Sequence, residues 1–133
     1  LLRESTPARA ALQKLEAEFS KRQKDVEETG VRLKVTAERF EKDSPVMTES
    51  DRARRQRELA ELDREFQRKQ REFREDLNQR RNEEMQGLVE RSNRIIRQIA
   101  EQEKFDLIVQ EAVYFNPRID ITERVLKALN AAR

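Results

Sequence analysis

The chain has no Cys, His or Trp, and it contains only two Gly and three Pro. Without Cys or His, neither the usual zinc sites nor a Ser–His or Cys–His nucleophile pair can be built. Two glycines cannot form the Gly-rich loop that holds nucleotide phosphates. No run of 18 apolar residues occurs either, so the sequence predicts no transmembrane helix. We therefore expect a protein that is not an enzyme and that needs no cofactor and no metal.

The sequence is rich in charged residues. Of the 133 residues, 42% are charged and 35% hydrophobic, whereas typical domains are about 25% charged and 45–50% apolar. One conventional core is therefore not expected, and part of the chain should be extended. The 29 Lys and Arg nearly balance the 27 Asp and Glu, which is not the footprint of a dedicated nucleic-acid binder. No nucleic-acid partner is expected.

Pro45 is the only proline between Pro7 and Pro117. Proline cannot donate the helical hydrogen bond, so the proline-free runs on either side can form very long helices. At 1.5 Å per residue, a helix over residues 8–42 would span about 50 Å and one over 49–103 about 80 Å. We expect an antiparallel coiled-coil hairpin, here called the arm, with its tip at about residues 43–49.

Two apolar stripes support this hairpin, because their members recur at steps of three and four residues, or sums of these. A hydroxyl before Pro7 marks the start of the first helix, and Thr48 with Asp51 marks the start of the second. In an antiparallel pair, facing residues have a constant sum of numbers. Four pairs sum to 92, which centres the turn on Val46. The predicted seam consists of Leu15 with Leu77, Phe19 with Phe73, Val26 with Phe66, and Leu33 with Leu59.

The period changes after Lys104. The runs FDLIV at 105–109 and AVYF at 112–115 are short, apolar and rich in β-branched or aromatic residues, as in strands. A capping box of Asp120 with Glu123 should begin a last short helix. Two short strands are marginal by themselves, so this small β body should need further strands or other subunits. The predicted body and oligomer core is Ile95, Ile99, Phe105, Leu107, Ile108, Val109, Val113, Phe115, Ile121, Val125 and Leu129.

These C-terminal runs, with DITERVLK at 120–127 and the stretch RRNEE at 80–84 through GLV at 87–89, resemble the Skp/OmpH family of periplasmic chaperones. The resemblance covers nearly the whole chain in architecture and is most specific over residues 80–130. It implies a homotrimer with a small β body and three helical arms that enclose a cavity. It also implies ATP-independent holding of unfolded outer-membrane proteins in the periplasm.

The family's signal peptide and first β-strand would precede Leu1. We therefore expect residues 1–7 to be the remnant of an N-terminal body segment, which leaves the body short of one strand. Residues 8–84 would form the arm. Residues 85–133 would form the end of the long helix, the β body and the C-terminal helix.

A holdase needs many weak contacts and no fixed pocket, so candidate client-binding residues are sought on the arm. The densest basic cluster lies at its tip, beside two apolar residues. A solvated helix start or contact with an anionic membrane would also explain it, and a basic zipper is a weaker match. The candidate client-binding residues are Val46, Met47, Arg52, Arg54, Arg55 and Arg57.

Arg80 and Arg81 are adjacent near the base of the arm. Guanidinium groups bind phosphate well, and the family resemblance makes this pair a candidate for lipopolysaccharide or anionic lipid. The competing interpretation is ion pairing with Glu83 and Glu84 at helical spacing.

Two other functions stay open at this stage. A structural coiled-coil scaffold or spacer would have the same hairpin but neither cavity nor client. A prefoldin-like chaperone subunit also combines a β body with helical arms, but its termini lie at the ends of the coil, whereas here the predicted strands follow the second helix.

Overall fold

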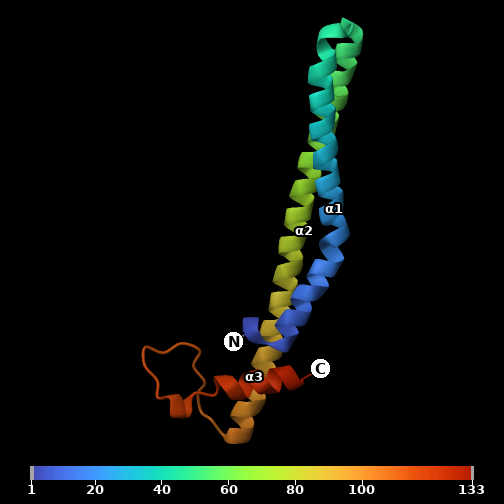
Figure 1. Cartoon of the computed structure of the whole chain (residues 1–133). Helices are drawn as coiled ribbons and strands as arrows, with labels where there is room; N and C mark the ends of the chain where they lie inside the picture. Colours follow the sequence, from blue (N-terminus) through green and yellow to red (C-terminus); the bar gives the residue numbers. More distant parts are fainter. Residues whose placement is uncertain (1, 133) are drawn as a thin grey trace. The chain divides into compact units, whose positions relative to one another are not determined.

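The computed structural model describes residues 2–132. Along the chain the elements are η1 (Leu2–Glu4), α1 (Thr6–Asp43), η2 (Ser44–Val46), α2 (Glu49–Glu103), η3 (Pro117–Ile119) and α3 (Thr122–Ala131), as Figure 1 shows. The chain divides into two compact units. Glu16–Gln79 forms one, called the hairpin unit, and the residues on either side of it form the other, called the terminal unit. The segment boundaries expected from the sequence stay predictions, and residues 1 and 133 of those segments lie outside the described residues.

Each long helix begins at a hydroxyl cap. The N–H of Ala8 donates to Ser5 Oγ at 3.2 Å, and the N–H of Asp51 donates to Thr48 Oγ1 at 3.1 Å. At the start of α1 the N–H of Thr6 donates to Asn130 Oδ1 of α3 at 2.8 Å. Because the following residue is Pro7, which has no N–H, the first-turn donors of α1 are satisfied.

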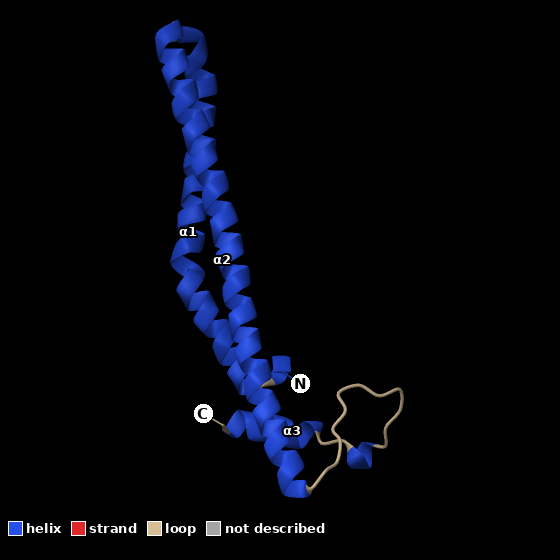
Figure 2. Cartoon of the chain, turned by 180° about the vertical axis from the view of Figure 1, so that it is seen from behind, coloured by secondary structure: helices blue, strands red, loops and turns tan. Residues whose placement is uncertain are grey.

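The expected coiled-coil hairpin is confirmed. Within the hairpin unit, α1 and α2 run antiparallel side by side, and the chain reverses in the short η2 turn that contains Pro45 (Figures 1 and 2). Phe19 and Phe73, one of the pairs expected in the seam, meet edge to face with ring centroids 5.9 Å apart. Phe19 is buried, and Arg22 stacks 5.4 Å from its ring centre.

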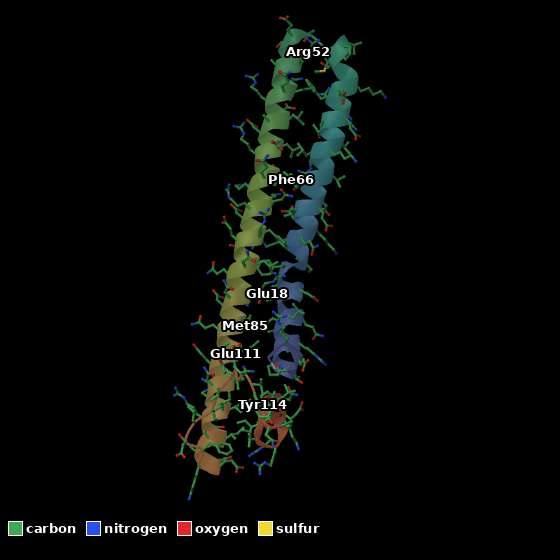
Figure 3. All side chains as sticks on the ribbon, turned by 90° about the vertical axis from the view of Figure 1, so that its left-hand side faces the viewer. Glu18, Arg52, Phe66, Met85, Glu111 and Tyr114 are labelled. Carbon is green, nitrogen blue, oxygen red and sulfur yellow. The ribbon has the colours of Figure 1, made fainter. Side chains whose placement is uncertain are left out.

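The ring of Phe66 also contacts a residue that the apolar stripes did not include. This residue is Gly30, one helical turn beyond Val26: a Cβ added to Gly30 would lie 2.9 Å from Phe66 Cε2. The expected pairing of Val26 with Phe66 stays a prediction. Glycine has no side chain, so it leaves a space on the surface of α1 that the phenyl ring fills. A search for apolar residues at helical spacing does not detect this space, because glycine is not counted in it. Figure 3 shows Phe66 between the two helices.

A polar layer lies between these two aromatic contacts. Lys69 Nζ lies 3.1 Å from Asp25 Oδ2 and 3.2 Å from Glu65 Oε1, and it donates to Thr29 Oγ1 at 3.3 Å. Thr29 is fully buried and donates to the Asp25 carbonyl at 2.8 Å. The hydrogen bond to Asp25 is the largest cause that raises the pKa of Lys69 above its ordinary value of 10.5. A polar residue at a seam position favours one register over its neighbours.

The terminal unit has a small apolar core where α3 crosses the end of α2. Four buried residues form it, with Ile96, Ile121 and Ala128 packed around them. Arg124 of α3 also pairs with Glu103 at the end of α2. α3 begins differently from the expected box, because Thr122 rather than Glu123 hydrogen-bonds to Asp120, and these bonds lower the pKa of that carboxyl. The core residues are Ile95, Ile99, Val125 and Leu129.

The expectation of a β body is wrong for the single chain. Residues 2–132 contain no strand, and residues 105–116 form an irregular loop (Figure 2). Strand propensity is present in the two runs, but a strand also needs a hydrogen-bonded neighbour. The runs do not pair with one another, and an isolated two-stranded pair would be marginal in water.

Candidate functional site

Arg52 and Arg55 hold the hairpin turn. Arg52 Nη2 donates to the carbonyls of Ser44 at 2.8 Å and Met47 at 3.2 Å. Arg55 Nη1 donates to Asp43 Oδ2 at 3.3 Å and lies 3.7 Å from Met47 Sδ. Two carbonyls of the turn thus accept hydrogen bonds from Arg52, and Arg55 binds the Asp43 carboxylate, at the end labelled Arg52 in Figure 3. These two arginines therefore stabilise the turn, in addition to any contact they make with clients.

The other tip residues point into solvent. Val46 is 88% exposed, and Arg54 forms only a long, exposed ion pair with Asp51 at 3.4 Å. Arg57 is exposed and has no ion pair within residues 2–132. Of the six candidate client-binding residues, Val46, Arg54 and Arg57 are therefore the most accessible. Their role in binding stays a prediction.

Arg80 forms ion pairs within its own helix. Its guanidinium lies 2.8 Å from Glu83 Oε2 and 3.0 Å from Glu84 Oε1, and Glu84 also pairs with Lys14 of α1 at 3.6 Å. Arg81 is exposed. The helical ion pairs anticipated as the competing interpretation are thus present for Arg80. Phosphate binding, which stays a prediction, would fall mainly to Arg81.

The loop between α2 and α3 exposes a large amount of apolar surface. Leu107 is 77% exposed, Tyr114 is 81% exposed, and Val113 is fully accessible. Ile108 alone among the expected strand residues is half-buried. So many exposed large apolar side chains within one short segment are typical of an interaction surface. The exposed members expected in the body core are Phe105, Leu107, Val109, Val113 and Phe115.

One charge pattern on α2 escaped the search for basic clusters. The triplet Arg-Glu-apolar occurs three times at a spacing of seven, at 57–59, 64–66 and 71–73. The apolar members Leu59, Phe66 and Phe73 are half-buried in the hairpin, whereas Arg57, Arg64 and Arg71 are exposed. This pattern would have been found by assigning each charged residue to a heptad position instead of looking for stretches dense in basic residues.

None of the described helices has an apolar stretch that could cross a bilayer. Nor do three acidic side chains gather anywhere in residues 2–132 as a metal site would require.

Residues 1–129 match a family model described as "Outer membrane protein (OmpH-like)". No curated protein matches the chain.

Proposed function

The chain belongs to the OmpH-like (Skp) family, and we propose that it is an ATP-independent holdase that keeps unfolded outer-membrane proteins from aggregating in the periplasm. Family membership over residues 1–129 is the observation that carries this proposal. Chaperones of this family are periplasmic and are not enzymes. The described residues fit that role, because they offer a long charged hairpin rather than an enclosed reaction site.

We further propose that the working form is a homotrimer with a cavity between its hairpins. The exposed loop supports assembly: Leu107, Val113 and Tyr114 lie uncovered on a segment with strand propensity. Such a segment can add to the edge of another sheet, which satisfies its backbone hydrogen bonds and covers its side chains. Three copies would supply one another with the strands that a single chain lacks.

The surface of the hairpin unit suits weak and exchangeable contacts. Unfolded outer-membrane strands alternate apolar and polar residues, so a wall of charge with scattered apolar groups matches them without a fixed pocket. Val46, Arg54 and Arg57 are the proposed first contacts at the tip. Exposed charges attract opposite charges at long range, and salt screens this attraction. Client capture should therefore slow between about 20 mM and about 500 mM salt, and equal capture rates would argue against electrostatic steering.

Contact with lipopolysaccharide or anionic lipid is a narrower proposal for Arg81. The Arg81→Ala variant should sediment less with anionic vesicles than the wild type, whereas Arg80→Ala should change binding less because Arg80 is already paired. Equal losses from both variants would remove the reason to single out Arg81.

A structural scaffold is the alternative, because the coiled-coil hairpin by itself would also serve as a spacer. The two functions separate in one assay: a urea-unfolded β-barrel protein is diluted into buffer without nucleotide, and its light scattering is followed. A holdase suppresses the scattering at stoichiometric concentration. A scaffold leaves the scattering as it is in buffer alone.

A further inference from the structure

The repeated triplets divide the surface of α2 into two flanks of opposite charge. With 3.6 residues per turn, a residue one position before the seam lies about 100° from it, and a residue two positions before lies about 200° from it. Each Glu of a triplet therefore lies on one side of α2, and each Arg lies about 100° further round, past the face opposite the seam. The basic flank is Arg57, Arg64 and Arg71, and the acidic flank is Glu58, Glu65 and Glu72.

The basic flank has no partner within the hairpin. All three arginines are exposed, and none of them makes an ion pair or hydrogen bond within residues 2–132. On the acidic flank, Glu65 pairs with Lys69 of the polar layer, whereas Glu58 and Glu72 are exposed and make no such pair in the described residues.

Pairing along α2 itself would be the ordinary explanation of such charges. The available neighbours four residues apart are Arg57 with Glu61, Arg68 with Glu72 and Arg71 with Glu75, and in each of them the arginine precedes the glutamate. This order is the weaker one for helical ion pairs, in agreement with the absence of these pairs from the described helix. The two flanks are thus open to a second molecule.

The spacing indicates what kind of molecule fits. Seven residues of helix rise about 10.5 Å, so the flank presents Arg57, Arg64 and Arg71 at that interval. An extended strand advances about 3.3 Å per residue and alternates its sides, so acids on one side of a strand do not keep this interval. A helix with acids at every seventh residue does keep it. The chain carries such a helix itself, because Glu58, Glu65 and Glu72 have the same period.

We propose that, in the assembled protein, the basic flank of α2 in one copy packs against the acidic flank of α2 in the next copy. This contact rests on the homo-oligomer of the proposed function. A closed ring needs two different and complementary patches on every subunit, and the two flanks provide them. Exposed ion pairs are individually weak and sensitive to salt, so neighbouring hairpins would separate readily to admit a client.

Distances between copies test this contact directly. Because the chain has no Cys, Ser50→Cys, at an exposed position near the turn, places one spin label on each copy. Pulsed electron resonance at about 20 mM salt should give a short, narrow distance distribution. At about 500 mM salt the distance should grow by roughly one helix diameter, about 10 Å.

Charge reversal supplies matched variants. Arg57→Glu with Arg71→Glu should give the long distance at both salt concentrations, and so should Glu58→Arg with Glu72→Arg. The four substitutions together restore opposite charges across the contact and should restore the short distance. None of these four side chains makes an ion pair or hydrogen bond within residues 2–132, and circular dichroism checks that each variant keeps its helices.

The possible results separate the proposals. Unchanged distances in an assembled protein, across salt and both double variants, would overturn the contact between copies while leaving assembly intact. Loss of client capture in the arginine variant at unchanged distance would assign the basic flank to clients and also overturn the contact. A single-chain mass in sedimentation, measured first, would overturn the assembly in the proposed function and this contact with it.

Discussion

The ring of Phe66 lies directly over Gly30, where an added Cβ would come within 2.9 Å of Phe66 Cε2 and 3.1 Å of Phe66 Cζ. The other glycine, Gly87 in α2, has no atom within 4 Å of such a Cβ. Both lie inside long helices, so the same substitution can be compared at a filled position and an open one.

Gly87→Ala should raise the free energy of unfolding by about 0.5–1 kcal/mol, because alanine is the better helix former. Gly30→Ala has the same gain in propensity, but it must displace the Phe66 ring, and overpacking costs about 1–3 kcal/mol. We expect a net loss of about 1 kcal/mol at Gly30. Urea unfolding followed by circular dichroism measures both.

The double variant Gly30→Ala with Phe66→Leu tests whether the Phe66 ring causes the loss of stability in Gly30→Ala. A smaller side chain at position 66 should make the alanine less costly than it is beside phenylalanine, which appears as a coupling free energy between the two sites. Additive effects would mean that the contact over Gly30 does not limit the packing of the seam.

Lys69 should make the hairpin sensitive to alkaline pH. Its folded-state pKa is raised, chiefly by the hydrogen bond to Asp25, so its stabilising contribution is complete below the ordinary pKa of 10.5 and is lost as the pH rises through the folded-state value. Melting temperatures between about pH 9 and about pH 11.5 should fall less steeply for Lys69→Met than for the wild type. Lys24→Met, at an exposed position of α1, controls for general loss of lysine charge. The same alkaline slope in all three proteins would refute the role of the polar layer.

Lys104 ends α2 at a measurable conformational cost. Its φ is 56°, and the N–H of the next residue, Phe105, donates to the Ala100 carbonyl at 2.9 Å. This is the Schellman arrangement, in which glycine is the favoured residue at the left-handed position. Lys104→Gly should therefore raise the free energy of unfolding by about 1 kcal/mol, whereas Lys104→Ala should not. A gain of the same size from both would trace the effect to the lysine side chain instead of the backbone.

The exposed loop should control assembly. Leu107→Asp or Val113→Asp places a charge on a surface that we expect to be covered by other copies, and burial of an unpaired charge is strongly unfavourable. Sedimentation velocity should then show a smaller species than the wild type. Val31→Asp, also at an exposed valine of 62% accessibility but in the hairpin unit, should leave the mass unchanged. A wild-type mass for both loop variants would show that copies do not meet through this loop.

The hairpin could be predicted from sequence because each of its determinants is local or periodic. Pro45 breaks the helix, Thr48 caps the next one, and the apolar stripes define the facing sides. The contact of Phe66 with Gly30 was missed because a glycine adds nothing to a hydrophobic pattern, although the space it leaves decides where the ring packs. The hydrogen bonds from Arg52 to the turn carbonyls depend on the geometry of the turn, which composition does not specify.

The strands were not predictable in the same sense. Leu107 and its neighbours have the side chains of a strand, but a strand also needs hydrogen-bonding partners, and residues 2–132 of one chain provide none. The strand propensity of this segment therefore indicated the structure that it could form beside other strands, and not the structure of the single chain. The opposite flanks of α2, by contrast, were present in the sequence as a repeat of seven and required only that charges be counted by helical position.

The central claim is that assembled copies of this chain hold an unfolded outer-membrane protein in solution. Native mass spectrometry of the full chain, after dilution of a urea-unfolded β-barrel without nucleotide, tests it most directly. We expect a species at three times the 15.9 kDa of one chain, and a second species heavier by the mass of the client. Copies that remain single while the barrel precipitates would contradict the account.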